Sequence, residues 1–450
     1  MFRKFTNGCV NLVQKYLPDP FLFAVILTII VFMMGVFLTG QAPKDMVGHW
    51  SGSFWSLLQF SMQMALVLVT GHTLAQAPII KKGLRGLASI PKTPGGAIFA
   101  VTLVALIASW VNWGFGLVIG ALYARELAKK VKGVDYRLLI AAGYTGFVIW
   151  HAGFSGSIPL TLATATSNLA DMTRGAVTDP IPTSDTIFAL FNLVPVLILL
   201  VTLPFLNKAM HPKAEDVVTV NPELLEADED QLAVTKENMT PAEKMENSPV
   251  LSLIIGIMGL VFIFKYFVDN GFSLNLNIVN FIFLFMGIIL HWTPRKFLNA
   301  VATAAKGTGG IIIQFPFYAG IMGMMTGANS EGLSLAAMMS NSFVSISSTT
   351  TFPFFSFLSA GIVNFFVPSG GGQWAVQAPI MMPAGAELGV DAAKTAMAIA
   401  WGDAWTNMIQ PFWALPALGI AGLGAKDIMG YCLVNLIYVG VVVSLCLLIL

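Results

Sequence analysis

A proline followed by a serine and three glycines constrains the fold of this chain most. The stretch Pro368-Ser369-Gly370-Gly371-Gly372 separates two apolar runs, 352–367 and 374–386, each too short to span a bilayer. Proline lacks a backbone N–H, and glycine destabilises a helix interior. In a membrane, the backbone groups freed by such a break must be satisfied by protein or by water in a cavity. The stretch therefore predicts the tip of a re-entrant hairpin.

A similar break occurs earlier in the chain, where Asn112-Trp113-Gly114-Phe115-Gly116 interrupts the apolar run 95–127. Each break is followed 38 or 37 residues later by a tryptophan that opens a second interrupted segment, at 150–159 and 401–411, and each of these segments ends in proline. Four such correspondences share an offset of about 251–261 residues. They indicate an internal duplication, and weak internal symmetry is typical of secondary transporters.

The composition is that of a membrane protein. Hydrophobic residues make up 56% of the 450 residues and charged residues 10%, whereas soluble domains carry about 25% charge. The net charge of +1 argues against a nucleic-acid partner. The three cysteines (Cys9, Cys432 and Cys446) have no metal-binding spacing. We therefore expect a polytopic helical membrane protein without a metal centre or cofactor.

Basic residues set the expected topology. Two basic stretches, 81–92 and 125–137, flank the interrupted run, so a crossing at 95–127 would place them on opposite sides of the membrane. A re-entrant hairpin places both in the cytoplasm. With hairpins at 95–127 and 352–388, 20 of the 24 lysines and arginines fall on the cytoplasmic side. The remaining segments then cross the membrane nine times, at 21–40, 54–75, 136–170, 185–206, 249–268, 274–292, 308–327, 392–424 and 428–450.

The predicted fold is therefore an all-α polytopic membrane protein with two inverted-topology repeats. Each repeat has a re-entrant hairpin and a broken transmembrane helix, at 136–170 in the first and 392–424 in the second. The first repeat covers 1–206, a flexible polar cytoplasmic linker 207–247, a connecting span 248–273 and the second repeat 274–450. The N-terminus is expected in the cytoplasm and the C-terminus in the periplasm. Hairpins entering from both faces suit alternating access around a site at mid-membrane.

Broken helices expose backbone N–H groups and the positive end of a helix dipole, which suit a small carboxylate. The alternative is that the glycines serve helix packing and that the hydroxyl groups cap the breaks. The substrate-binding candidates are Asn112, Gly114, Gly116, Ser155, Gly156, Ser157, Asn364, Ser369, Gly370, Gly371, Gly372, Gln373, Thr406, Asn407 and Gln410. Trp150, Trp374, Trp401, Trp405 and Trp413 cluster around the breaks, where packing is the default role and a site wall the alternative.

Asp403 is the one carboxylate well inside a predicted span, and His151 lies near the matching position of the first repeat. A central Asp costs roughly 2.5–3.5 kcal/mol on insertion scales, so such residues usually serve transport or pair with another group. Together the two side chains could carry a coupling proton. Asn112, Asn364 and Asn407 with freed carbonyls could instead ligate sodium, and spacing alone does not decide between the two ions.

Other functional classes explain less of the chain. Gly153-Phe154-Ser155-Gly156 matches the short G-x-S-G pattern of intramembrane serine proteases, but a hydrolase using Ser155 does not account for duplicated hairpins. No G-x-x-x-x-G-K-[ST] motif for an ATP-driven pump is present. A channel is a further alternative, although channels are usually symmetric oligomers around one pore. We expect a carrier and not an enzyme.

Five motifs resemble the bacterial short-chain fatty acid transporter family, and the resemblance runs from end to end. They are Leu17-Pro18-Asp19-Pro20, Asn112-Trp113-Gly114-Phe115-Gly116, Gly153-Phe154-Ser155-Gly156-Ser157, Val367-Pro368-Ser369-Gly370-Gly371-Gly372 and Gln410-Pro411-Phe412-Trp413-Ala414-Leu415-Pro416. The resemblance implies a secondary carrier of acetoacetate or butyrate in the bacterial inner membrane. It also implies the inverted-repeat architecture of the ion-transporter superfamily, proton or sodium coupling, and often a homodimer. A carrier of another small carboxylate or a dicarboxylate is the alternative.

Overall fold

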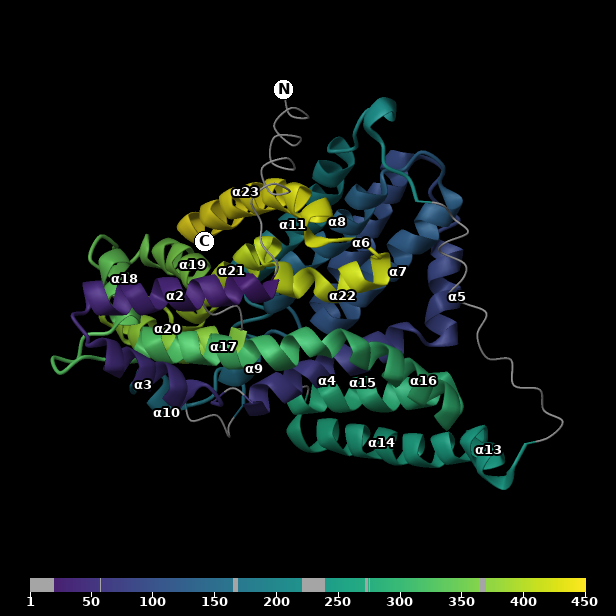
Figure 1. Cartoon of the computed structure of the whole chain (residues 1–450), viewed down its shortest axis with the longest axis horizontal. Helices are drawn as coiled ribbons and strands as arrows, with labels where there is room; N and C mark the ends of the chain where they lie inside the picture. Colours follow the sequence, from purple (N-terminus) through teal and green to yellow (C-terminus); the bar gives the residue numbers. More distant parts are fainter. Residues whose placement is uncertain are drawn as a thin grey trace.

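The computed structural model describes residues 20–450 apart from 57, 165–168, 221–238, 272–273, 275 and 365–369. Every regular element in this part of the chain is a helix, as the sequence predicts (Figure 1). Five of the described helical segments are long and apolar enough to cross a membrane: Pro94–Val111, Tyr136–Leu162, Leu190–Ala209, Pro249–Asn270 and Ala425–Ile449. The bent pair Ser61–Ala75 and Pro78–Leu87 makes a sixth if it forms one span.

Shorter apolar helices complete the membrane part of the fold, at Ala24–Leu38, Asn277–His291, Ile312–Thr326 and Phe352–Asn364. The helix Pro249–Asn270 has the most exposed apolar surface of the described helices long enough to cross a membrane. Its apolar side chains are exposed along the whole length, Phe264 at 72% and Ile257 at 57%. A helix that exposes apolar residues on most of its surface is one that lipid covers.

The first half of the chain runs from α2 to α11. Its elements are α2 (Pro20–Leu38), α3 (Pro43–Ser53), α4 (Leu58–Ala75), α5 (Pro78–Leu87), α6 (Pro94–Val111), α7 (Trp113–Lys130), α8 (Tyr136–Thr145), η1 (Gly146–Ala152), α9 (Ser157–Leu162), α10 (Leu169–Met172) and α11 (Leu190–Ala209). The elements from α6 to α9 contain both interruptions predicted for the first repeat, at 112–116 and 150–159.

The second half runs from α14 to α23 after a linker with two short helices, η2 (Ala214–Asp216) and α13 (Pro241–Glu246). Its elements are α14 (Pro249–Asn270), α15 (Leu276–His291), α16 (Pro294–Ala305), η4 (Lys306–Thr308), α17 (Gly309–Thr326), α18 (Leu335–Val344), α19 (Phe352–Asn364), α20 (Gly370–Glu387), α21 (Ala392–Thr406), η5 (Asn407–Ile409), α22 (Pro411–Ala421) and α23 (Ala425–Ile449).

Asn112 ends α6 and begins α7. Its backbone is extended (φ −157°, ψ 126°), and its side-chain Oδ1 accepts a hydrogen bond from the Phe115 N–H at 2.9 Å. This is an N-cap, which satisfies one of the donors that a new helix leaves open. The two arms touch just beyond the turn, because a Cβ on Gly116 would overlap the backbone of Ser109. The chain therefore reverses at Asn112 and forms a hairpin.

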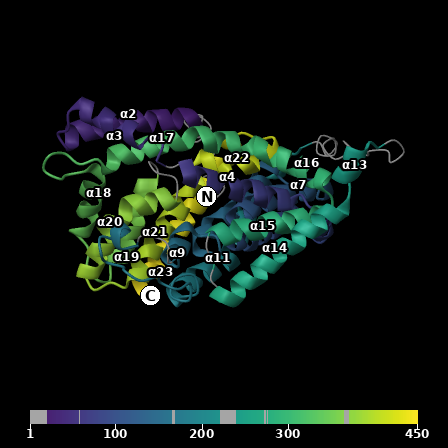
Figure 2. The same cartoon turned by 90° about the horizontal axis from the view of Figure 1, so that it is seen from below.

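The second hairpin consists of α19 and α20, and its tip, residues 365–369 with the candidate Ser369, lies outside the described residues. Figure 1 shows α6 and α7 at the right of the molecule and α19 and α20 at the left, with the broken helices α8–α9 and α21–α22 between them. The view from below gives the same order (Figure 2). The two hairpins thus lie on opposite sides of the broken helices (Figure 1).

The two broken helices differ in detail from the expected interruption. In the first, the helix starts again at Ser157, so Pro159 lies in the first turn of α9 and not in the break. Proline is tolerated there because first-turn N–H groups have no partner within the helix. In the second, η5 and the extended Gln410 separate α21 from α22, which starts at Pro411.

Several short helices were not expected from the sequence, namely α3, α5, α16 and α18. They are too short or too polar to read as spans, and their positions in basic or polar stretches suggested loops. The linker also differs from a wholly flexible segment, because the Val218 N–H donates to Asp135 Oδ2 at 2.9 Å and the Tyr136 N–H to the Val218 carbonyl at 2.8 Å. In α13, hydrogen bonds from the Thr240 backbone and side chain hold the pKa of Glu243 below its ordinary value.

Candidate functional site

The two predicted ionisable residues meet in the centre of the molecule. His151 Nδ1 lies 2.8 Å from Asp403 Oδ2, and both side chains are completely buried. His151 comes from η1 of the first repeat and Asp403 from α21 of the second. Sequence spacing places the two residues at matching depths but does not predict that they bond to each other. The contact therefore joins the two repeats through a titratable pair.

The hydrogen bonds of His151 fix its tautomer. Its Nε2 accepts a hydrogen bond from the backbone N–H of Ile158 at 3.0 Å. Because a backbone N–H can only donate, Nε2 is the acceptor and the ring proton lies on Nδ1, where it is donated to Asp403. A second proton on this imidazole has no place unless the bond to Ile158 breaks. The protonation state of His151 is thus linked to the geometry of the break before α9.

The pair lies on the symmetry axis of the duplication. His151 is 39 residues after Asn112, and Asp403 is 39 residues after Asn364. The two residues therefore occupy equivalent positions in the two repeats. A residue that contacts its own equivalent must lie close to the axis that relates the repeats. In transporters with inverted repeats such an axis runs in the membrane plane.

A cluster of buried amides and hydroxyls holds Asp403 in the second repeat. Asn364 Nδ2 donates to the Asp403 carbonyl at 2.9 Å, to Thr406 Oγ1 at 2.8 Å and to Asn407 Oδ1 at 2.8 Å. Asn407 Nδ2 lies 3.3 Å from Asp403 Oδ2, and Gln410 Nε2 donates to the Asn364 carbonyl at 3.4 Å. Asp403 Oδ1 is buried, and none of the described residues forms a hydrogen bond with it. Four predicted site residues are thus brought together around one carboxylate.

The N-terminus of α20 lies against the imidazole ring. A Cβ on Gly370 would be 2.6 Å from His151 Cε1 and 3.1 Å from Trp150 Cη2, so only glycine fits without movement. Gly371 and Gly372 follow in the same first turn of α20. Gln373 instead uses its Nε2 for the Ala360 carbonyl and for Gln377 Oε1, both at 2.8 Å. The structure therefore places Gly370 at the titratable pair and ties Gln373 to the neighbouring arm.

At the first tip, the predicted residues largely satisfy one another. Ser155 Oγ accepts the Trp113 backbone N–H at 2.9 Å, and Asn112 caps α7. A Cβ on Gly114 would be 2.6 Å from the Val67 carbonyl of α4. Gly116 packs on Ser109, and Gly156 on the His151 carbonyl. These contacts fit the packing alternative for the three glycines. Ser157 Oγ remains buried without a partner.

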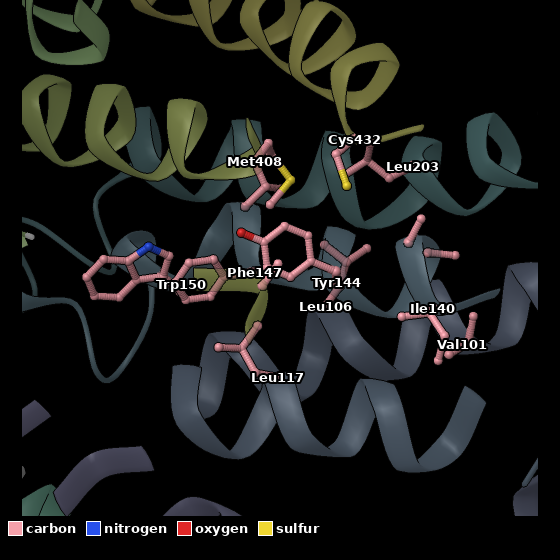
Figure 3. Packing of buried hydrophobic residues seen from close by; sticks show 14 of the residues in the cluster. Val101, Leu106, Leu117, Ile140, Tyr144, Phe147, Trp150, Leu203, Met408 and Cys432 are labelled. Atoms are coloured by element: carbon pink, nitrogen blue, oxygen red, sulfur yellow. The ribbon is translucent and has the colours of Figure 1, made fainter. Parts of the chain in front are cut away.

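Aromatic rings line the first-repeat side of the pair. Trp150 stacks on His151 with ring centroids 4.1 Å apart, and Phe147 stacks on Trp150 at 5.6 Å (Figure 3). Trp113 meets Trp150 at 6.2 Å and Trp413 at 5.3 Å. Trp113 was not among the expected site residues, because a tryptophan in an apolar run reads as packing. The Tyr144 hydroxyl, also unexpected, donates to the Asn407 carbonyl at 2.7 Å.

Trp401 and Trp405 serve as structural donors. Trp401 Nε1 donates to Asn192 Oδ1 at 2.9 Å, and Asn192 in turn donates to the Ala152 carbonyl at 3.1 Å. Trp405 Nε1 donates to the Leu436 carbonyl at 2.7 Å. Both indole N–H groups are thus occupied by protein, as expected for residues whose role is packing.

Two alternative chemistries lack the geometry that they need. A serine hydrolase requires a base hydrogen-bonded to the nucleophile, whereas Ser155 accepts from Trp113 and both His151 nitrogens are engaged elsewhere. Among the described residues, no group of three or more His, Cys, Asp or Glu side chains could hold a metal ion. Of the three asparagines considered for sodium, Asn364 and Asn407 are in contact, while Asn112 caps a helix in the other repeat.

The family follows from comparison with known proteins. The family profile described as short chain fatty acid transporter matches residues 1–450. A protein of Escherichia coli (strain K12) assigned as a short-chain fatty acid transporter is 44% identical over 442 residues, 98% of each chain. A protein of Haemophilus influenzae (strain ATCC 51907 / DSM 11121 / KW20 / Rd) with the same assignment is 44% identical over 440 residues, 97% of each chain.

Among solved structures, that of the YdaH transporter of Alcanivorax borkumensis is similar to this chain with a TM-score of 0.49 and 16% identity. The match covers 95% of this chain and 98% of that one, and it is too weak to inform the substrate or the mechanism. Family membership rests on the profile and the two relatives alone. The chain belongs to the short-chain fatty acid transporter family, and it is a membrane transporter and not an enzyme.

Proposed function

We propose that this protein is a secondary active carrier that moves one short-chain monocarboxylate, such as acetoacetate or butyrate, together with one proton. The observation that carries the proposal is the buried hydrogen bond between His151 and Asp403, which joins equivalent positions of the two repeats. Ionisable residues at mid-membrane are expensive and usually belong to a transport path. The substrate class comes from the family, and the coupling ion from this pair.

The charges around the pair favour a proton over sodium. Within the described residues, the side chains of His151 and Asp403 have no lysine or arginine in ion-pair distance, and their polar partners are the Ile158 N–H and the Asn407 amide. A substrate carboxylate next to the Asp403 carboxylate would place two like charges in a low-dielectric site. One added proton removes this repulsion. We therefore expect a stoichiometry of one proton per monocarboxylate and a transport cycle that moves no net charge.

The position of the pair suits alternating access. The start of α20 lies against the His151 ring, and the two hairpins lie on either side of the broken helices (Figures 1 and 2). Both side chains are sealed from solvent, so protons reach them only when one hairpin or broken helix moves. Such a site opens to one side at a time. We place the carrier in the bacterial inner membrane with its N-terminus in the cytoplasm, following the distribution of basic residues.

The test is uptake of labelled butyrate and acetoacetate into proteoliposomes under imposed pH or sodium gradients. We expect uptake with an inward proton gradient, no response to sodium, and no response to an imposed membrane potential. Empty liposomes supply the background, because neutral short acids also cross lipid unaided. Uptake driven by sodium alone would contradict proton coupling. If neither acid moves above background under any gradient, the substrate class is wrong.

A further inference from the structure

Three buried N–H donors on the first hairpin tip and the adjoining η1 have no acceptor among the described residues. They are Asn112 Nδ2, Trp113 Nε1 and Trp150 Nε1, in side chains exposed by 1%, 1% and 2%. The orientation of the Asn112 amide is not arbitrary, because its oxygen must face the Phe115 N–H that it caps. Buried donors nearly always find a partner, and each exception needs an explanation.

Atoms of the opposite kind are left over in the second repeat. Asp403 Oδ1 and Asn364 Oδ1 are buried and have no donor within the described part of the chain. The Asn364 amide is also oriented unambiguously, since its nitrogen must face the Asp403 carbonyl. The atoms left unused beside His151 and Asp403 are therefore donors on Asn112, Trp113 and Trp150 and acceptors on Asp403 and Asn364.

Ring contacts connect these two sets. Trp113 lies 6.2 Å from Trp150 between ring centroids, Trp150 stacks on His151 at 4.1 Å, and His151 bonds to Asp403 at 2.8 Å. The side chains that carry these unused atoms are thus connected through Trp150, His151 and Asp403. Figure 3 shows Trp150 at the edge of the aromatic cluster, stacked on Phe147. A ligand that fills this neighbourhood needs an acceptor group toward the first repeat and a donor toward the second.

We propose that the substrate is held here as a carboxylic acid. Its carboxyl oxygens accept hydrogen bonds from Asn112, Trp113 and Trp150, and the co-transported proton lies between the carboxyl group and Asp403 Oδ1. The inference deepens the proposed function and rests on it. The substrate anion and one proton enter together and leave together, and no covalent bond other than O–H is made or broken. We expect a dicarboxylate to bind less well, because in the described part of the chain no lysine or arginine forms an ion pair with His151 or Asp403 that could balance its second charge.

Indole variants test the donors directly. Trp113→Phe and Trp150→Phe keep an aromatic ring and remove the N–H. We expect each to raise the half-saturation concentration for proton-driven butyrate uptake about fivefold, the effect of losing one hydrogen bond between neutral groups. The matched control is Trp50→Phe, since Trp50 Nε1 also lacks an acceptor but lies on α3 against Gly320 of α17. Its half-saturation should not change.

A further variant guards against misfolding. Asn112→Asp retains the oxygen that caps α7, loses the amide donor and adds a carboxylate, so butyrate uptake should fall by more than in either indole variant. On the wild-type protein, the ultraviolet resonance Raman bands that report indole N–H hydrogen bonding should shift when butyrate binds.

The outcomes separate the two proposals. If the wild type takes up butyrate with protons while all three site variants keep its half-saturation, or if the indole bands do not shift, the donor set has no role in binding and the proposed function still stands. If the wild type takes up no acid above the empty-liposome background, the proposed function fails.

Discussion

The two hairpin tips occupy equivalent positions in the sequence, but their side chains make different contacts. At the first tip, Asn112 caps α7, Ser155 takes the Trp113 N–H, and the glycines pack against backbone. At the second, Asn364 links α19 to α21 through three hydrogen bonds, and Gly370 lies against the imidazole of His151. The first tip caps its own helix and leaves the Asn112 amide and Trp113 indole N–H groups unused among the described residues, whereas the second tip is built around the titratable pair. Duplication thus kept the positions of the breaks while the side chains diverged.

The divergence is clearest at the axis. If both repeats had the same residue there, two imidazoles or two carboxylates would be in contact. The chain instead has one imidazole and one carboxylate, which bond to each other at 2.8 Å. The two repeats therefore differ at this position, with a histidine in the first and an aspartate in the second, and these two groups can share a proton. The variants below break or sharpen this comparison, in order of decreasing effect.

Placing an aspartate at both equivalent positions should have the largest effect on uptake. His151→Asp would bring two carboxylates into contact in a buried site, and the loss of a buried partner costs roughly 3–5 kcal/mol. We expect proton-driven butyrate uptake at neutral pH to fall by at least about a hundredfold. Uptake should recover partly at acidic pH, where the two carboxylates share a proton. Full uptake at neutral pH would show that the imidazole is dispensable.

At the second tip, Gly370→Ala should impair transport more than folding. The added methyl group meets the side chains of His151 and Trp150 and no backbone atom. We expect uptake to fall by about tenfold, the effect of roughly 1–2 kcal/mol of overpacking at the pair, while thermal unfolding changes little. Gly419→Ala in α22 is the control, because a Cβ there meets no atom within 4 Å. Equal uptake by both variants would mean that α20 does not need to approach the imidazole.

At the first tip, Gly116→Ala should show the opposite pattern. The methyl group would overlap the backbone of Ser109, which cannot rotate away as a side chain can. We expect a loss of about 1–3 kcal/mol in the free energy of unfolding, from overpacking between the arms of the hairpin. Uptake per folded molecule should change less than in Gly370→Ala. A variant of normal stability that fails to transport would reverse the roles assigned to the tips.

Much of the architecture could be predicted from the sequence, because glycines and prolines indicate breaks in helices and basic residues indicate the topology. Asn112 and Asn364, and His151 and Asp403, are recognisable as counterparts from their spacing. What spacing does not contain is contact across the axis, since it depends on how two repeats dock. The bond from His151 to Asp403, the proton on Nδ1 and the packing of Gly114 and Gly116 against backbone therefore came only from the structure.

The missed features share a physical cause. Helices α3, α5, α16 and α18 lie outside long apolar runs, and their helical state depends on tertiary packing more than on pattern. Trp113 has an unused N–H only because its neighbours offer no acceptor, a fact that no local sequence reveals. Pro159 marks a break in the sequence but occupies the first turn of α9, where a missing N–H is tolerated.

The central claim is that Asp403 carries the coupling proton, and one comparison tests it most directly. Asp403→Asn keeps the size of the side chain and removes its titration, while Asp391→Asn retains the N-cap of the same helix as a matched control. Net uptake and butyrate exchange would be measured for both in proteoliposomes. We predict that Asp403→Asn abolishes net proton-driven uptake and retains exchange, and that Asp391→Asn keeps both. Normal net uptake by Asp403→Asn would contradict the account and leave Asp403 a structural hydrogen-bond acceptor.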